Sequence, residues 1–416
     1  MVSLKCLGAS HEVGRSAFIL STDKNFLLDY GLKVFDLSGE PKYPIAFEEK
    51  IDAALISHAH LDHSGYIPHL YTKHENIHWY ATPPTRDICE LLLKDSMKIM
   101  GEKLPYKLSH YHTALKQWHP VFYDKKFHLG DTSFVYRDAG HIVGSSMIEI
   151  YYNNQKILYT GDFKTEGTRL HKGAEFVEDV DTLIIEGTYG NKEHPDRAGL
   201  EKQLVMEIEE TLGQGGHVLM PAFALGRSQE VISIIRSYSK DIPIYLDGMS
   251  KEIARIYMKY PYYIKNFGSF EQAIDSINFV ENFNIRKQVT RNPCVIVTTA
   301  GMMQGGPVLE YLFNVNPESK VIFTGYSVEG TNGWRLLNHG KIMKDDYELD
   351  VSLPVEYLDF SAHAAKSELV EFVKKANPKK VVVVHADPAV ADEFTNTLKG
   401  EGFNAVAPNL EEVVEL

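Results

Sequence analysis

Four potential metal ligands within six consecutive residues constrain the fold of this chain more than any other feature. The stretch His58–His63, with the sequence HAHLDH, directly follows the apolar segment Ala53–Ser57, which we predict to be a buried strand. Alternate residues of an extended segment point the same way, so His58 and His60 can bind one metal ion. The Asp-His pair that ends the stretch can turn toward a second ion. A solvated histidine-rich loop is the alternative, but such a loop needs no comparable density of ligands beside a buried strand.

The composition is that of a globular protein with enough residues for two cores. Of the 416 residues, 44% are hydrophobic and 24% are charged. No apolar run approaches the roughly 18 residues of a membrane helix, and the N-terminus lacks signal-peptide features, so we expect a cytoplasmic protein with no membrane partner. The formal charge of -13 argues against coating nucleic acid through bulk charge, but it permits strand binding in a groove beside metal cations. The three cysteines are far apart and are expected to be buried thiols.

The order of predicted elements divides the chain into three parts. Short strands dominate up to about Leu183, after which strand, loop and helix alternate repeatedly. This alternation predicts an α/β fold with a parallel sheet covered by helices on both faces. Because candidate ligands occur both near the N-terminus and in the tail, we expect residues 190–350 to be an inserted domain. Residues 1–189 and 351–416 would then form one domain together.

Further candidate ligands follow the first group along the chain. His141 comes after a glycine, Asp162 ends the segment YTGD, and His385 lies in VVHAD, while Asp29 lies near the start in FLLDYG. Together with HAHLDH, these segments resemble the ordered motifs of the metallo-β-lactamase superfamily. The resemblance implies an αββα sandwich that binds two zinc ions, and the sequence leaves manganese open.

The resemblance also distributes the ligands between the two ions. One ion would be held by His58, His60, His141 and Asp162, and the other by Asp62, His63, Asp162 and His385. Asp29 would support the site without binding metal. Two such ions bind the attacking and the departing oxygen of a displacement at phosphorus. The expected attacking group is a hydroxide that bridges the two metals. Asp62 is expected to be a catalytic residue as well as a ligand.

Three later segments resemble motifs A, B and C of the β-CASP branch of this superfamily, a group of nucleases. They are Ile185–Gly190 (IEGTYG), Phe360–Ala364 (FSAHA) and Val383–Asp387 (VVHAD). The resemblance spans nearly the whole chain and is strongest to archaeal cleavage-factor-like ribonucleases without N-terminal KH domains, which are related to RNase J. It implies that Glu186 pairs with His363. Because the leaving oxygen needs a proton and His363 has no ligand role in the family pattern, we hypothesise that His363 protonates that oxygen. A local hydrogen bond within the Ser-Ala-His turn is the alternative role.

The loops of the predicted insertion contain residues that commonly bind phosphate. Backbone amides, hydroxyls and helix N-termini can all contact phosphate groups. The candidates are Arg227, Ser228, Thr299, Gly305, Gly306 and Thr331. Ordinary turn chemistry at strand ends is the alternative explanation.

The sequence therefore predicts a zinc-dependent ribonuclease that hydrolyses single-stranded RNA in RNA processing or decay. Endonucleolytic and 5′-to-3′ exonucleolytic cleavage both remain open, as do a homodimer and association with other RNA-processing proteins. By analogy within the branch, His385 favours RNA over DNA. Two alternatives are a small-molecule hydrolase of the same fold and a non-catalytic or weakly active scaffold subunit of an RNA-processing complex.

Overall fold

The computed structural model describes residues 2–34, 40–74 and 76–416. The chain forms two compact units. Unit 1 comprises the residues up to Gly167 together with His171–Glu193 and Ala362–Leu416, and unit 2 comprises Thr168–Leu170 and His194–Ser361. Among the described residues, no helix has both the length and the apolar character needed to cross a bilayer.

Unit 1 contains two seven-stranded sheets. The first has the order β22-β1-β2-β3-β4-β5-β6, with β1 (Ser3–Cys6), β2 (Ala17–Ser21), β3 (Asn25–Tyr30), β4 (Ala53–Leu55), β5 (His78–Ala81), β6 (Trp118–Pro120) and β22 (Val413–Glu415). The second has the order β21-β20-β11-β10-β9-β8-β7, with β7 (Lys126–Leu129), β8 (Thr132–Asp138), β9 (Ser146–Tyr152), β10 (Gln155–Tyr159), β11 (Thr182–Glu186), β20 (Lys380–Val384) and β21 (Ala405–Val406). Segments from both ends of the chain complete these sheets.

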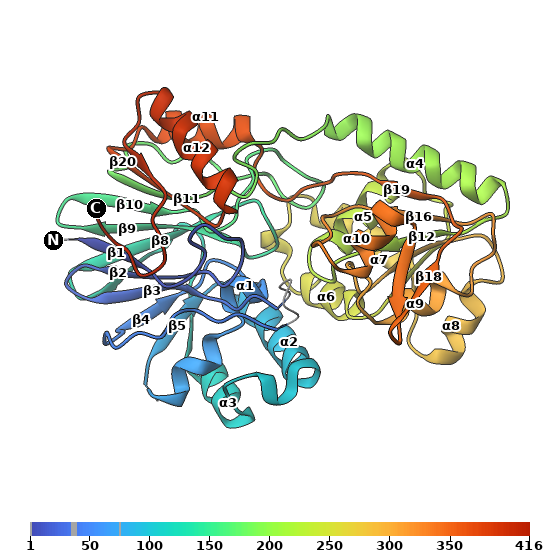
Figure 1. The fold of residues 1–416 in the computed structure, drawn as a ribbon, viewed down its shortest axis with the longest axis horizontal. Helices are drawn as coiled ribbons and strands as arrows, with labels where there is room; N and C mark the ends of the chain where they lie inside the picture. The colour runs from blue at the N-terminus through green and yellow to red at the C-terminus, as the bar shows by residue number, and fades with distance from the viewer. Residues whose placement is uncertain (1, 35–39, 75) are drawn as a thin grey trace. The chain divides into compact units, whose positions relative to one another are not determined.

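Helices cover the outer faces of the two sheets, giving the four layers visible in Figure 1. One side carries α1 (Leu61–Ser64), η1 (Ile67–Thr72), α2 (Pro83–Met100), η2 (Gly101–Lys103) and α3 (Leu108–Lys116), and the other carries α11 (Lys366–Ala376) and α12 (Pro388–Gly400). The sheets contact each other through buried rings, such as Phe26 of β3 against Phe134 of β8. Phe372 of α11 and Phe394 of α12 pack into the apolar core of the second sheet.

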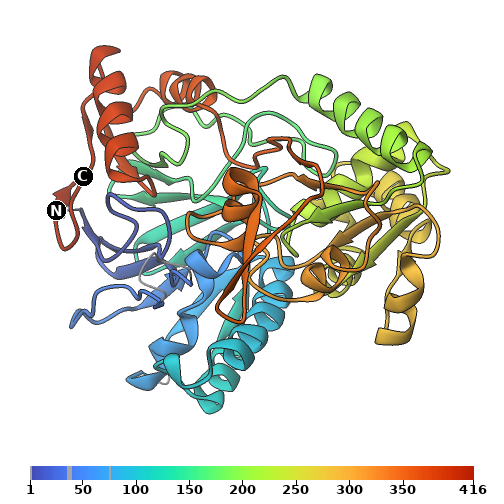
Figure 2. The ribbon, with the colours of Figure 1, turned by 45° about the vertical axis from the view of Figure 1, so that its right-hand side comes forward.

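Unit 2 is built on six parallel strands in the order β14-β13-β15-β12-β16-β19. The strands are β12 (Val218–Pro221), β13 (Ile244–Asp247), β14 (Asn278–Phe279), β15 (Val295–Thr298), β16 (Lys320–Phe323) and β19 (Val355–Tyr357), and a hairpin is formed by β17 (Lys341–Lys344) and β18 (Tyr347–Asp350). The helices are α4 (Arg197–Gly213), α5 (Arg227–Tyr238), α6 (Ser250–Tyr257), η3 (Pro261–Tyr263), α7 (Phe267–Asp275), α8 (Phe283–Val289), α9 (Pro307–Leu312) and α10 (Asn332–His339). They lie on both sides of the sheet (Figure 2).

The predicted α/β class and the parallel sheet of the later region are confirmed, and the three cysteines are free and buried as expected. The expected boundaries at 189/190 and 350/351 differ from the changes between units at Glu193/His194 and Ser361/Ala362. The second difference has a clear physical cause. Strand β19 pairs in parallel with β16, so the first strand of the predicted tail belongs to unit 2.

Candidate metal centre

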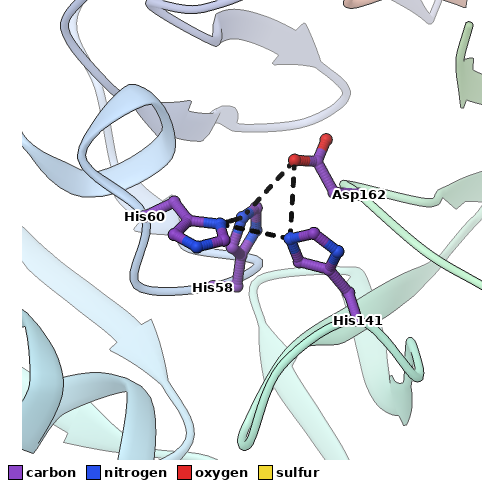
Figure 3. Close-up of side chains that lie close together, drawn as sticks. All are labelled: His58, His60, His141 and Asp162. Atoms are coloured by element: carbon purple, nitrogen blue, oxygen red, sulfur yellow. Dashed lines mark hydrogen bonds and ion pairs between the residues drawn. The ribbon is translucent and has the colours of Figure 1, made fainter. Parts of the chain in front are cut away.

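Three histidines and one aspartate of unit 1 converge in the group shown in Figure 3. His58 and His60 follow β4, whereas His141 lies between β8 and β9 and Asp162 follows β10. Nε2 of His58 and Nε2 of His141 each lie 3.1 Å from Nδ1 of His60. Oδ2 of Asp162 lies 3.6 Å from His58 Nε2 and 3.8 Å from His141 Nε2. Four potential ligand atoms thus face one point.

The hydrogen bonds behind these rings determine which nitrogens present lone pairs to that point. Ser57 Oγ donates to Asp29, so it accepts from Nδ1 of His58 at 3.0 Å. Nδ1 of His141 donates to the carbonyl oxygen of Ala362 at 2.8 Å. The inward nitrogens of both rings therefore carry lone pairs. The single nitrogen of His60 between them can donate a proton to only one, so a cation satisfies this arrangement better than hydrogen bonds do.

Asp62, His63 and His385 form a second group with ligand atoms close together. Oδ2 of Asp62 lies 4.0 Å from His63 Nε2 and 3.4 Å from His385 Nε2. The Asp162 carboxylate adjoins this group as well as the first, since Oδ2 is 3.3 Å from His63 Nε2 and Oδ1 is 3.2 Å from His385 Nδ1. A carboxylate between two such groups has the position that a bridging ligand requires.

Two buried polar atoms of these groups make no hydrogen bond within the described part of the chain. They are Oδ1 of Asp162 and Nε2 of His385, in side chains that are both 3% exposed. Oδ1 of Asp162 lies 3.2 Å from His385 Nδ1, and Nε2 of His385 lies 3.4 Å from Asp62 Oδ2, so each atom has an ion-pair partner but no hydrogen bond. A buried polar atom without a hydrogen bond costs free energy. These carboxylate and imidazole atoms, together with the inward lone pairs, form a set of donors of the kind that holds divalent metal ions. The residues present therefore fit a divalent metal ion.

Asp29 lies directly behind the candidate ligands. Its buried carboxylate accepts hydrogen bonds from Ser57 N at 2.6 Å, Ser57 Oγ at 2.7 Å, Tyr159 OH at 2.6 Å and His63 Nδ1 at 2.7 Å. Both oxygens are occupied by protein donors. The bond to His63 orients its Nε2 toward Asp162, so Asp29 fixes a candidate ligand.

His363 and Glu186 form a third group beside Asp162. Nδ1 of His363 lies 3.1 and 3.0 Å from the two Glu186 oxygens and 4.0 Å from Asp162 Oδ2. Burial alone would lower the pKa of His363, but the charges of Glu186 and Asp162 raise it to about 9. The His363 side chain is 22% exposed and that of Asp62 is 32% exposed, whereas His58 is fully buried. His363, the histidine predicted to donate a proton, is therefore on the more exposed side of the centre, together with Asp62.

The charges of the centre divide its histidines into two kinds. Burial lowers the pKa of His58 well below its ordinary value and lowers that of His60 to about 4, so both rings are neutral as ligands must be. Burial would also lower the pKa of His63, but Asp162 and Asp29 raise it well above its ordinary value. The carboxylates thus attract positive charge, which a metal ion can supply in place of a proton.

The predicted phosphate-binding residues all lie in unit 2, and several have structural roles there. Ser228 Oγ donates to Phe223 O at 2.7 Å and contacts Ser250 Oγ at 2.8 Å, and the Thr331 hydroxyl caps α10. Arg227 begins α5, with Nε near Gly325 of the loop after β16. The remaining candidates, Thr299, Gly305 and Gly306, lie in the loop between β15 and α9.

Sequence reasoning missed several residues that position the centre. Ser57 and Tyr159 bind Asp29, and Thr188 Oγ1 lies 3.2 Å from Nδ1 of His385. Ser57 directly precedes HAHLDH, Thr188 lies within IEGTYG and Tyr159 begins YTGD, and this proximity to recognised motifs is a usable signal. The contact of Tyr159 with Asp29 joins residues 130 positions apart, and no local pattern indicates it.

Three family matches together span most of the chain. Residues 24–219 match the Beta-lactamase superfamily domain, and residues 228–336 match the Beta-Casp domain. Residues 348–408 match the Zn-dependent metallo-hydrolase RNA specificity domain. The first and third matches contain all the candidate ligands described above.

Curated relatives match over nearly the full length. "Probable RNase MJ4" of Methanocaldococcus jannaschii is 39% identical, covering 98% of this chain and 99% of that protein. "RNase aCSPSF2" of Saccharolobus solfataricus is 35% identical over 97% of this chain and 83% of its own. "Transcription termination factor FttA" of Methanosarcina mazei is also 35% identical, over 95% and 69%.

A solved structure supports the fold independently. The crystal structure of a protein of unknown function from Enterococcus faecalis V583 covers 100% of both chains with a TM-score of 0.66 and 14% identity. From the domain matches and the full-length relatives, we conclude that this chain belongs to the β-CASP family of metal-dependent ribonucleases within the metallo-β-lactamase superfamily.

Proposed function

We propose that this protein binds two zinc ions and hydrolyses phosphodiester bonds of single-stranded RNA in RNA processing or decay. The observation that carries the proposal is the convergence of seven candidate ligands in unit 1, with the Asp162 carboxylate between the two groups. The RNA specificity domain match and the relatives named as ribonucleases support RNA as the substrate.

His58, His60, His141 and Asp162 would hold one ion, and Asp62, His63, Asp162 and His385 the other. When bound, the pair would supply Lewis acidity toward a phosphoryl oxygen and lower the pKa of bound water. The chain's own residues orient these ligands. Ser57, Ala362 and Asp29 each accept a hydrogen bond from the outward nitrogen of one histidine, which directs the inward nitrogen to the centre.

His363 is the residue that we assign to the leaving oxygen. Its ring is held through Nδ1 by Glu186 and is not a member of either four-ligand set. It lies on the more exposed side of the centre, where a substrate can arrive. A proton held there can pass to the departing oxygen as the phosphodiester bond breaks.

Two alternatives are less well supported. A scaffold subunit would not need the full set of inward-facing ligands, and here that set is present. A small-molecule hydrolase would not need unit 2, a second domain built on six parallel strands. Measured rates of RNA cleavage and of small-substrate hydrolysis distinguish both alternatives from the proposal.

The test is a comparison of substrates with purified protein. Single-stranded RNA labelled at either end, a circular form of the same RNA, a simple phosphodiester and a thioester are incubated in parallel. We expect cleavage of the linear RNA to be far faster than hydrolysis of either small substrate. Cleavage of the circle would identify an endonuclease, because a circle has no end. Efficient thioester hydrolysis without RNA cleavage would overturn the proposal.

RNA should be cut faster than DNA of the same sequence at matched salt. The RNA specificity domain match motivates this expectation, together with His385 in the third β-CASP motif. Only RNA offers a 2′-hydroxyl, and loss of one hydrogen bond of about 1 kcal/mol corresponds to roughly fivefold. Initial rates on end-labelled strands measure the ratio, and equal rates on both would show that the preference is wrong.

Arg227→Ala should weaken RNA binding while metal content stays unchanged. Arg227 lies at the start of α5 beside a glycine of a neighbouring loop, where a guanidinium can meet a phosphate. Losing one phosphate contact should reduce the salt slope of binding by about 1. Arg291→Ala, also in unit 2 but outside these loops, is the control. An unchanged affinity and slope for Arg227→Ala would leave the loops with ordinary turn roles.

A further inference from the structure

A buried lysine lies two residues after Asp162, in a position that the proposed mechanism does not use. The side chain of Lys164 is only 1% exposed. Its Nζ lies 3.2 Å from Oε2 of Glu368, 3.3 Å from Glu166 and 3.4 Å from the carbonyl oxygen of His363. A buried ammonium group requires such partners. One of them is the backbone of the histidine assigned to the leaving oxygen.

Glu368, in the first turn of α11, joins the same two segments. Its Oε1 accepts from Thr165 N at 3.1 Å, Thr165 Oγ1 at 2.6 Å and Glu166 N at 2.7 Å. Its Oε2 accepts from Ala365 N at 2.9 Å. Burial would raise the pKa of Glu368, but Lys164 and the backbone amides hold it below its ordinary range. One ionised carboxylate therefore connects the segment after Asp162 with the segment that carries His363.

Backbone hydrogen bonds align the same two segments. Ala364 N donates to Phe163 O at 2.8 Å, and Phe163 N donates to Glu186 Oε1 at 2.9 Å. His363 is thus fixed at both ends: Glu186 holds its ring, and Lys164 holds its peptide oxygen. Movement of either segment would displace the ring relative to Asp162.

The chemistry of this pair favours a positional role over a purely stabilising one. A buried ion pair seldom stabilises a fold more than well-packed apolar side chains of similar volume. What it provides here is a fixed arrangement, because each partner has several hydrogen bonds to different segments. We propose that Lys164 and Glu368 are positioning residues that keep the His363 segment aligned with the Asp162 segment for proton transfer. This inference rests on the proposed ribonuclease function.

The test is a double-mutant cycle on the full-length, zinc-loaded protein. Lys164→Met keeps the length of the side chain and removes its charge. We expect unchanged zinc content and RNA affinity, with single-turnover cleavage slower by about 10- to 100-fold, since small displacements of a reacting group have effects of this size. In the His363→Ala background, Lys164→Met should cause no further loss, because Lys164 acts through His363.

Two further variants keep the test decisive. Glu368→Gln retains an oxygen that accepts from the backbone amides and should slow cleavage in the same non-additive way, even if Lys164→Met folds poorly. Glu149→Gln is the matched control, because Glu149 is a buried acid of β9 paired with Arg137 and Lys156. It should lower the melting temperature without changing the cleavage rate.

Three outcomes would overturn the inference: wild-type cleavage rates in both Lys164→Met and Glu368→Gln, losses that multiply with His363→Ala, or loss of zinc. The last would make Lys164 a support of Asp162 as a ligand. Failure of the wild-type protein to cleave RNA would instead overturn the proposed function. The two failures are therefore distinguishable.

Discussion

Asp162→Ala should lose both metal and RNA cleavage. The carboxylate lies within 3.8 Å of candidate ligand nitrogens in both groups, so its removal would deprive each proposed ion of a ligand. Metal ions contribute several kcal/mol of transition-state stabilisation, and about 1.4 kcal/mol corresponds to a tenfold change in rate. We therefore expect cleavage to fall on the order of 10³-fold or more. Elemental analysis and single-turnover kinetics on the same preparation measure the two losses.

Asp181→Ala provides the matched control for this variant. Strands β10 and β11 are parallel neighbours. Asp181 directly precedes the start of β11, whereas Asp162 follows the end of β10, so the two residues lie at opposite ends of these strands. Asp181 pairs with Lys379. Its removal should leave zinc content and cleavage unchanged. Full activity of a metal-free Asp162→Ala protein would contradict the assignment of Asp162 as the bridging ligand.

His363→Ala should separate cleavage from metal binding. The variant should keep both ions and bind RNA normally, since His363 is in neither ligand set. Single-turnover cleavage should fall by about 10²–10⁴-fold, the usual contribution of a positioned acid. Glu186→Gln should also keep the metals and should lose less, because a glutamine can still contact Nδ1 while its charge is gone.

Three measurements on these variants decide the role of His363: zinc content, RNA affinity and single-turnover rate. Near-normal cleavage by His363→Ala would remove His363 from the mechanism. Loss of zinc would instead make it a structural support of the centre, through its contact with the Asp162 carboxylate.

The α/β class was predictable because local patterns determine it. The run Pro84–Met100 has helical spacing with proline at its start, and the helix α2 occupies Pro83–Met100. The segment Ala53–Ser57 was expected to be a strand throughout, but β4 ends at Leu55. The amide of Ser57 donates to the Asp29 side chain instead of pairing with a neighbouring strand. Interactions with the distant Asp29 thus set the end of this strand.

The domain boundaries depended on pairing that the sequence does not display. Val355–Tyr357 is a short strand that could join either sheet, and only its pairing with β16 assigns it to unit 2. Short apolar segments carry little information about their partners, because many alternatives bury the same side chains.

The grouping of the candidate ligands was predictable, because their motifs are compact and occur in family order. Asp29 was expected to support the site, but the other residues that orient the candidate ligands were not identified from the sequence. Tyr159, Lys164 and Glu368 contact the centre or its loops only after distant segments fold together. Nothing in the sequence distinguishes Lys164 from other charged residues, and its burial is seen only in the folded chain.

Zinc titration of chelator-treated protein tests the central claim most directly. Bound metal and cleavage of end-labelled single-stranded RNA are measured at each addition, with Asp162→Ala in parallel. We predict no cleavage without metal, full activity as about two ions bind per chain, and no recovery in the variant. Undiminished RNA cleavage by protein shown to contain no metal would contradict the account.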